Sequence, residues 1–346
     1  MASNNNMTLT ITIPTYNRPD KVLNTVKMLI PQLNSNVQIS ILDNCSDINV
    51  KDYLENNIQN LSSYPINVIR HKVNIGADAN FARCFEFCDT PWIWTLGDDD
   101  LVIEDAIDII LNEIQLYNNY DLIGFNFNSN CNKAKRNKPI LINNTHEMAN
   151  NLDFFGNWLF ISTAVYKTQE YFKYIQFATW GAYSMASQIV PAMLAISNNK
   201  TFVLSEKTIA DNIPLEDADE RWSAVKLSMV ITSLLEVPVN FNKDYMAFGK
   251  KLAVQQLVPI GAPAYAIIKS VNDDLSLIDD YHLYLYKQFY YRSIDFREKK
   301  IKLFFQFHMW CFLLRHPSIL TLVIKLFKRR FEFIKKAFGK FDLFIR

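Results

Sequence analysis

Strand-like and helix-like segments alternate along the first 130 residues, and this alternation limits the chain to a small set of folds. Residues 8–14 ("TLTITIP") form a β-branched run, whereas residues 19–33 carry apolar side chains at a helical spacing. The expected strands cover residues 8–14, 37–42, 66–69, 92–96 and 122–127, and the expected helices cover residues 19–33, 77–88 and 102–117. This order predicts an α/β fold, a mostly parallel sheet with helices on both faces.

The remainder of the chain is predicted to be mainly helical. Residues 159–166 and the start of 201–222 resemble strands, residues 180–197 resemble a helix, and the pattern beyond residue 223 is helical. We therefore predict a sheet-containing domain over residues 1–215. A helical extension over 216–300 and amphipathic basic helices over 301–346 are expected to follow it.

The composition is that of a globular protein with a substantial core. Hydrophobic residues make up 49% of the 346 residues and charged residues 21%, which excludes a disordered chain. The net charge of +1 gives no reason to expect a nucleic-acid partner. The five cysteines include no C-x-x-C pair, so we expect reduced thiols in a cytosolic protein and no zinc site. The N-terminus does not resemble a signal peptide, and no spanning helix is expected.

Three consecutive aspartates, Asp98, Asp99 and Asp100, follow the tryptophan-rich strand and precede a helix. Adjacent carboxylates repel one another and are costly to bury, and a divalent cation relieves both effects. Mg²⁺ or Mn²⁺ would take oxygen ligands from these side chains and from a diphosphate. The alternative is a helix N-terminus enriched in acidic residues.

Polar residues also close the other expected strands. Asp43 ends the second strand and could accept a hydrogen bond from a nucleoside base, or could form an Asx-turn. Thr15 and Tyr16 of "PTYNRPD" could contact a nucleoside, and Arg18 a phosphate. In a parallel sheet, ligands bind beyond the carboxyl ends of the strands. We therefore expect the aspartates to lie at this edge of the sheet, near Asp43.

Four segments in order resemble glycosyltransferase family 2, a group of inverting enzymes with the Rossmann-like GT-A fold. They are "TITIPTYNRPD", "ISILDNCSD", "NIGADANFARCFEFC" and "WIWTLGDDDLV", and the resemblance covers residues 8–123. The wording "TLGDDD" is most similar to the abequosyltransferase-like subgroup, which serves bacterial O-antigen and capsule synthesis. The resemblance implies a nucleotide-sugar donor (UDP-, TDP-, GDP- or CDP-linked) and a glycan or polyprenyl-diphosphate-linked acceptor.

The resemblance also implies roles for single residues. Metal ligation falls to Asp98 and Asp100, the two ends of the D-x-D element, while Asp99 could face the donor sugar. The residues implied at the nucleoside are Pro14, Thr15, Tyr16 and Asp43. Those implied beside the diphosphate and ribose are Asn80, with Asn74, Gly76 and Arg83. The implied cofactor is Mn²⁺ or Mg²⁺.

The catalytic base is harder to place on the family pattern. The family's carboxylate belongs at the start of a helix that corresponds here to residues 180–197, which contain none. The nearest acidic residues follow the next strand, and the candidates are Asp211, Glu216, Asp217 and Asp219. The alternative for this loop is an acid-rich helix N-terminus. The missing helix carboxylate favours a second function, that of a non-catalytic sugar-binding or scaffold subunit.

The C-terminal tail has a basic amphipathic pattern. Apolar residues from Ile324 to Ile345 recur at alternating spacings of three and four, with lysines and arginines mostly off that stripe. This pattern is typical of a helix that lies in a membrane interface. The apolar stretch before it, residues 303–327, is interrupted by His308, Arg315 and Pro317 and could lie in the interface rather than span. We expect peripheral membrane contact through this tail, and a cytoplasmic protein at the inner face of the inner membrane. Packing on the protein's own core, or a coiled-coil seam, are the alternatives.

Overall fold

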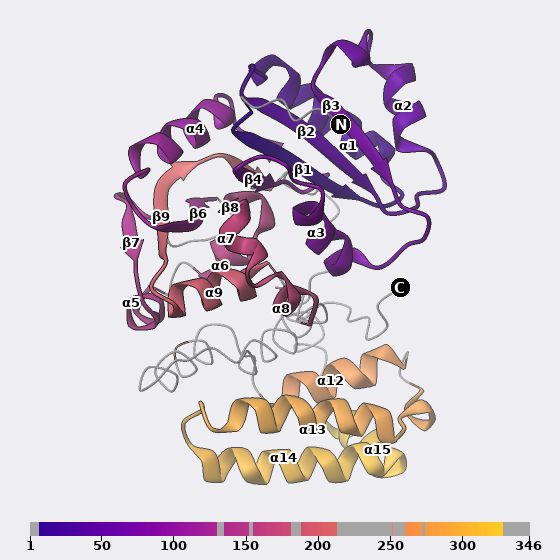
Figure 1. The fold of residues 1–346 in the computed structure, drawn as a ribbon. Helices are drawn as coiled ribbons and strands as arrows, with labels where there is room; N and C mark the ends of the chain where they lie inside the picture. The colour runs from indigo at the N-terminus through magenta and orange to yellow at the C-terminus, as the bar shows by residue number, and fades with distance from the viewer. Residues whose placement is uncertain are drawn as a thin grey trace. The chain divides into compact units, whose positions relative to one another are not determined.

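The computed structural model describes residues 7–129, 135–151, 155–180, 188–212, 251, 260–271 and 274–327. The chain divides into two compact units. Within the described residues, the first unit holds every strand and the second consists of helices α12 to α15 (Figure 1). The domain boundaries expected at residues 215 and 300 stay predictions.

A mixed sheet forms the centre of the first unit. Its strands are β1 (Leu9–Thr15), β2 (Val37–Asp43), β3 (Ile66–Arg70), β4 (Trp92–Thr95), β6 (Leu122–Asn128), β7 (Ile140–Ile142), β8 (Ala164–Lys167) and β9 (Thr201–Thr208). They lie in the order β3-β2-β1-β4-β8-β6-β9-β7, in which β8 and β7 run antiparallel to their neighbours. The expectation of a mostly parallel sheet is confirmed, with these two strands reversed.

Helices cover both faces of this sheet. They are α1 (Pro19–Leu29), α2 (Val50–Asn57), α3 (Ala77–Glu86), α4 (Ala106–Leu116), α5 (Thr145–Asn150), α6 (Phe155–Leu159), α7 (Thr168–Phe172), α8 (Ile175–Trp180) and α9 (Ile189–Ser197). Apolar residues of α1, α2 and α4 share one core with alternate sheet residues such as Ile11 and Ile39. Phe85 of α3 stacks on Tyr171 of α7 and packs by Tyr166 of β8. Since side chains alternate along a strand, α3 and α7 lie on the opposite face from that core.

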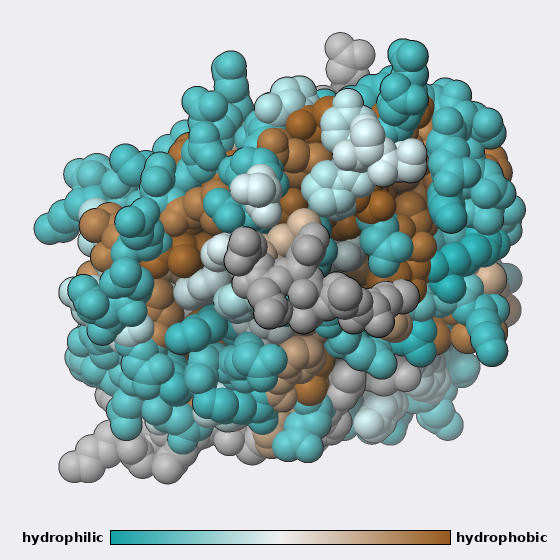
Figure 2. All heavy atoms as spheres, turned by 45° about the horizontal axis from the view of Figure 1, so that its top comes forward, coloured by the Kyte–Doolittle hydropathy of each residue, from teal (hydrophilic) through white to brown (hydrophobic). Residues whose placement is uncertain are grey.

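The inner strands are apolar because helices cover them on both sides. In β1 the alternation places Leu9, Ile11 and Ile13 in the shared core, while Thr10 and Thr12 point to the other face and are equally buried. These threonines have partners, since the Thr10 and Thr90 hydroxyls lie 2.7 Å apart and Thr12 donates to the carbonyl of Trp94. Buried hydroxyls of this kind remain satisfied. Hydrophilic side chains cover much of the face drawn in Figure 2, with hydrophobic atoms visible between them.

Two local expectations were wrong. The helix expected from residue 102 begins only at Ala106, because residues 100–102 form a short strand, β5 (Asp100–Val102), paired antiparallel with β10 (Ala210–Asn212). The strand expected at 159–166 begins only at Ala164, after the 3₁₀ turn η4 (Ile161–Thr163). The helix expected at 180–197 is described only as α9, since residues 181–187 lie outside the described residues.

The second unit is helical, as expected. It contains α12 (Gly261–Ser270), α13 (Asp280–Ile294), α14 (Lys300–Arg315) and α15 (Pro317–Leu326). Its core is aromatic, with Tyr290 of α13 stacked on Phe307 of α14 at 3.8 Å between ring centroids. In the described part of the chain, a single helix long and apolar enough to cross a membrane is not found. Only α14 and α15 together satisfy that criterion, and they are bent by 114° at their junction.

Candidate active site at the carboxyl ends of the strands

Side chains from β1 and from the segment after β4 meet at the carboxyl edge of the sheet. The Thr15 hydroxyl donates to Oδ2 of Asp98 at 2.6 Å, and Nη1 of Arg18 donates to Oδ1 of the same carboxylate at 2.9 Å. Arg18 also donates to Asp99 at 3.0 Å. We call Thr15, Arg18 and the three aspartates the aspartate cluster. It forms because β1 and β4 are adjacent parallel strands whose ends lie side by side.

Asp100 has a separate partner. The Ser162 hydroxyl of η4 donates to Oδ2 of Asp100 and accepts a hydrogen bond from the Gly97 N–H at 2.8 Å. The Ser162 carbonyl in turn accepts from the Trp94 indole at 2.8 Å, which fixes η4 on β4. A Cβ on Gly97 would lie 2.2 Å from the Asp100 oxygen, so a larger residue here would displace the Asp100 carboxylate from its position beside Ser162.

The three aspartates differ in burial. Asp98 and Asp100 are 5% and 7% exposed, whereas about a third of the Asp99 side chain is open to solvent. Burial raises the pKa of Asp98, against the lowering effect of Arg18 and Thr15. Burial also raises the pKa of Asp100, to about 7, and the charges of Asp99 and Asp98 add to this while the Ser162 hydroxyl opposes it. The raised pKa values indicate that Arg18 and the two hydroxyl groups offset only part of the cost of burying these carboxylates.

The oxygen donors of the cluster fit a hard divalent cation that arrives with phosphate. In the described ranges, no three His, Cys, Asp or Glu side chains are grouped so as to hold a metal by themselves. Mg²⁺, however, is typically bound by one or two carboxylates together with substrate phosphates and water. Asp98 and Asp100 supply such carboxylates, although Asp98 is bound by Thr15 and Arg18 and Asp100 by Ser162. Their role as metal ligands stays a prediction.

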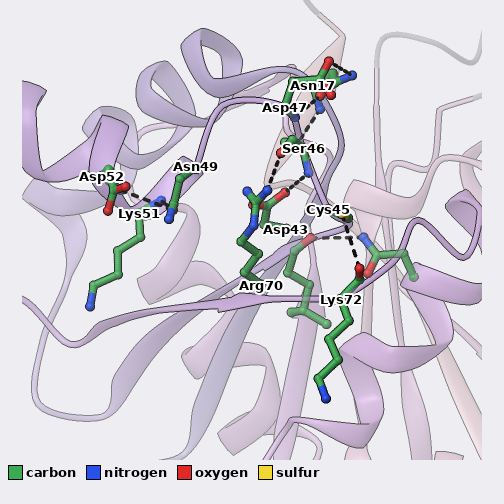
Figure 3. Close-up of polar contacts among 12 residues, drawn as sticks. Asn17, Asp43, Cys45, Ser46, Asp47, Asn49, Lys51, Asp52, Arg70 and Lys72 are labelled. Atoms are coloured by element: carbon green, nitrogen blue, oxygen red, sulfur yellow. Dashed lines mark hydrogen bonds and ion pairs between the residues drawn. The ribbon is translucent and has the colours of Figure 1, made fainter.

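Asp43 lies at the end of β2 and is completely buried. Its Oδ1 accepts from the Ser46 N–H at 2.8 Å, and its Oδ2 pairs with Nη1 of Arg70 at 2.8 Å (Figure 3). Arg70 ends β3 and also donates to the Ser46 carbonyl at 2.6 Å. The Ser46 bond is of the kind expected for a turn at a strand end. The predicted base contact of Asp43 stays a prediction.

The loops after β1 and β2 are joined to each other. The Asn17 N–H donates to the Ser46 hydroxyl at 2.9 Å, and the Asp47 N–H donates to Oδ1 of Asn17 at 2.7 Å (Figure 3). Asn17 and Cys45 have left-handed backbones, with φ values of 56° and 67°. Because Thr15 is paired in register with Asp43, these bonds connect the aspartate cluster to the end of β2.

Residues after β3 complete this edge. Oδ1 of Asn74 accepts from the Asn44 side chain at 2.8 Å and from the Gly76 N–H at 2.9 Å. Gly76 has φ +86°, and a Cβ there would meet nothing within 4 Å, so the space beside its backbone is open. Asn80 is buried and donates to the Leu42 carbonyl at 3.0 Å, while its Oδ1 lies 3.0 Å from Nε2 of His71. Asn80 thus holds the end of β2 in place. The contact of Asn80 with the diphosphate and ribose stays a prediction.

Two residues of the β1 end differ in exposure. Pro14 is half-buried and is paired with Leu42 within the sheet. Tyr16, at the edge of the site, is 43% exposed. An exposed aromatic face at this position is suited to stacking on a planar group. Arg83, on α3, lies 4.0 Å from Glu86.

Of the candidate bases, the structure describes Asp211. It lies in β10 opposite Leu101, one register position from the pair formed by Asn212 and Asp100, and it is buried. Pairing of β5 with β10 thus brings the segment after β9 to the aspartate cluster. Glu216, Asp217 and Asp219 lie outside the described residues.

Two residues that hold site carboxylates, Arg70 and Ser162, were not predicted from the sequence. Arg70 could have been found, because a basic residue directly follows the strand expected at residues 66–69. Ser162 gives no such signal, since it lies 62 residues from Asp100 in a turn.

About half of the chain is similar to a known protein family. Residues 10–175, which are 166 of the 346, match the model of glycosyl transferase family 2. An uncharacterized glycosyltransferase from Haemophilus influenzae is 29% identical over 115 residues, covering 33% of this chain and 37% of that relative. The chain therefore spans little more than a third of the relative's length.

Solved structures show the same fold. The S. aureus TarS structure of residues 1–349 in complex with UDP-GlcNAc has a TM-score of 0.57 at 12% identity, covering 86% of this chain and 89% of that one. The same fragment in complex with UDP has a TM-score of 0.51 at 12% identity, covering 84% and 89%. The prediction of the GT-A fold is confirmed, and residues 10–175 are similar to glycosyl transferase family 2.

Proposed function

We propose that this protein is an inverting glycosyltransferase that moves a sugar from a nucleotide-sugar donor to a hydroxyl of a glycan acceptor. The aspartate cluster is the observation that carries the proposal. It gathers three carboxylates and one arginine at the sheet edge, where ligands of α/β folds bind. The family match of residues 10–175 supports the same reaction class.

The donor is a nucleoside diphosphate linked to a sugar, with UDP, TDP, GDP or CDP as the nucleotide. TarS, which shares the fold, has been solved with UDP-GlcNAc. The exposed ring of Tyr16 would stack on the nucleoside, and the open space beside Gly76 would admit the ribose and diphosphate. Pro14 and Asp43 would line the base from the ends of β1 and β2.

A divalent cation, Mn²⁺ or Mg²⁺, supplies positive charge to the diphosphate when bound. Asp98 and Asp100 would hold it. Thr15 and Ser162 orient the two carboxylates, and Arg18 keeps Asp98 and Asp99 in place through its Nη1. Such preset groups need little rearrangement when negative charge develops on the leaving diphosphate.

In the proposed reaction an acceptor hydroxyl attacks the anomeric carbon from the side opposite the diphosphate. The new glycosidic bond forms as the bond to the diphosphate oxygen breaks, a carboxylate takes the hydroxyl proton, and the configuration inverts. We assign the base to Asp211, because it lies in β10, which pairs with the strand that Asp100 begins. Glu216 and Asp217 are the competing assignments.

The test measures nucleoside diphosphate release from pooled donors, with Mn²⁺, Mg²⁺ or EDTA and a glycan acceptor. Asp100→Ala should abolish transfer while the fold is retained, and Glu55→Ala, an exposed acid on α2, should leave it unchanged. Activity of Asp100→Ala in EDTA would refute the metal role. A folded wild-type protein that binds a donor yet releases no diphosphate with either metal would point to a sugar-binding or scaffold subunit.

The same assay separates the candidate bases. Asp211→Asn should lower kcat about 10²–10⁴-fold with a smaller change in KM, because general-base catalysis contributes about that much. Asp217→Asn serves as the parallel variant. If it alone lowers kcat, the base lies in the segment after β10 and the assignment of Asp211 is wrong.

The cellular role follows from the subgroup that "TLGDDD" resembles. The acceptor would be a growing O-antigen or capsule glycan, carried on a polyprenyl diphosphate at the cytoplasmic face of the inner membrane. Transfer to lipid-linked acceptor glycans, compared with transfer to the free glycans, tests this role.

A further inference from the structure

The two last described helices expose a large apolar surface. We define the outer face as Ile301, Phe304, Phe305, Met309 and Phe312 of α14 together with Ile319, Leu322 and Leu326 of α15. The α14 members recur at intervals of three and four residues, which places them on one side of the helix. Phe305 and Ile301 are 66% and 77% exposed. Such a patch marks an interaction surface in a soluble protein.

The outer face is additional to the side of α14 that builds the core. Phe307, Cys311 and Leu314 are buried against α12, α13 and α15, and Phe307 stacks on Tyr290. The helix is thus apolar on two sides, although a surface helix usually has one apolar side and one polar side. Folding of the second unit requires only the first of these sides. The outer face therefore serves a different contact.

The charges around the outer face are positive. Lys299, Lys302, Arg315 and Lys325 are exposed on or next to α14 and α15. Residues 299–346 hold twelve Lys and Arg against two acidic residues, a net charge of +10, whereas residues 1–298 have a net charge of −9. Two copies of this surface would repel each other, so the charge opposes self-association. An anionic surface is attracted to it.

The geometry favours a surface contact over a membrane crossing. Neither α14 nor α15 is long and apolar enough to span alone, and the 114° bend between them prevents one straight helix. A bent pair with exposed phenylalanines and flanking cations is suited to lie at the headgroup level of a bilayer. Anionic lipids attract basic segments there.

We propose that the outer face docks on an anionic phospholipid bilayer, with its aromatic and aliphatic side chains inserted at the interface and its cations on the headgroups. The proposal places the membrane contact on α14 and α15, which cover the apolar stretch before the basic tail, and it names the side chains that make the contact. It goes beyond the proposed reaction and does not depend on it.

The test is flotation of the full-length protein, without donor or metal, with phosphatidylcholine vesicles that contain or lack 30% phosphatidylglycerol. Wild type should bind the anionic vesicles at least 10-fold better. The double variant Phe304→Ser/Phe305→Ser should lose at least 10-fold of this binding. Lys302→Glu/Arg315→Glu should lose binding to anionic vesicles and the loss should be largest at low salt.

Matched controls change equally exposed residues elsewhere. Leu116→Ser on α4 and Lys27→Glu/Lys138→Glu in the first unit should float like wild type. Circular dichroism and nucleoside diphosphate release with a soluble acceptor should match wild type in every variant, which separates this proposal from the proposed reaction. Unchanged flotation of both outer-face variants would overturn it. So would a wild-type dimer, seen by light scattering, that Phe304→Ser/Phe305→Ser dissociates without any vesicle binding.

Discussion

The three adjacent aspartates have three different environments, although they are identical in the sequence. Asp98 meets Thr15 and Arg18, Asp99 is partly open to solvent, and Asp100 meets Ser162. The strand before them and their place at the sheet edge were predictable from hydrophobicity and turn pattern. Their division among partners was not, because Ser162 comes to Asp100 only through the packing of η4 on β4.

The buried carboxyl of Asp100 makes a prediction for stability against pH. Its folded-state pKa is about 7, above the value of an unfolded aspartate, so the folded state binds the proton more tightly. The stability that the protonated Asp100 carboxyl contributes to the folded state is therefore fully present below about pH 4 and is lost as the pH rises through about 7. In EDTA, Asp100→Asn should be stabilised relative to wild type at pH 8, by at most about 4 kcal/mol, and less so at pH 5.

Urea unfolding of both proteins at pH 5 and pH 8 in EDTA measures this difference. Glu55→Gln is the control, because it removes an exposed carboxylate of α2 that lies outside the aspartate cluster. An unfolding midpoint for Asp100→Asn that follows wild type at both pH values would contradict the burial argument. Addition of Mn²⁺ at pH 8 should stabilise the wild-type protein. It should stabilise Asp100→Asn much less.

At the scale of elements, the ends of β2 and β3 are held together by one ion pair. Asp43 is fully buried, while about a third of the Arg70 side chain is exposed. Removal of Arg70 leaves a buried carboxylate with one fewer partner, which is costly.

Arg70→Met should therefore destabilise the protein by roughly 2–3 kcal/mol, below the usual cost for a fully buried pair because Arg70 is partly solvated. The double variant Arg70→Met/Asp43→Asn should recover part of this loss. Lys51→Met is the matched control, since its pair with Glu55 is exposed at 3.8 Å and should contribute less than about 0.5 kcal/mol. Urea unfolding measures these losses of stability. Equal losses for Arg70→Met and Lys51→Met would show that the Asp43–Arg70 pair stabilises the protein no more than an exposed pair does.

The strands with the strongest hydrophobic runs were predicted within a residue or two, because burial on both faces leaves a clear signal in β1, β2 and β4. The short pairings were not. Nothing local marks residues 100–102 as a strand, since their partner β10 lies more than a hundred residues later. Helix α2 was missed as well, because it is short and only Val50 and Leu54 are buried in it, although Asn49 caps it with bonds to two backbone N–H groups.

At the scale of the whole molecule, the first unit holds the candidate site and the second holds the outer face. The sequence separated the two parts by pattern and indicated that residues 303–327 could lie in a membrane interface, but it did not show which side of α14 is exposed. Exposure cannot be read from a helix that is apolar on two sides, because either side could form the core.

Binding of a donor nucleotide should stabilise the folded protein through this first unit. With Mn²⁺, one nucleoside diphosphate among UDP, GDP, CDP and TDP should raise the melting temperature. At a concentration 100 times its Kd, it should increase the free energy of unfolding by about 2.7 kcal/mol. Arg18→Gln should weaken this shift, and Lys138→Gln should not. If no nucleoside diphosphate shifts the melting temperature with Mn²⁺ or with Mg²⁺, the donor proposal fails.

Strand β8 has a consequence for biogenesis. It lies between β4 and β6 and is hydrogen-bonded to both, yet it comes after both in the chain. A nascent polypeptide that has left the ribosome only as far as β6 has β4 and β6 but not the strand that joins them. The unpaired sides of β4 and β6 are then open edges, which are the places where strands of different chains associate. The sheet is completed only after β8 and then β9 have been made, so the earlier part of synthesis is the period in which this protein most needs protection by chaperones.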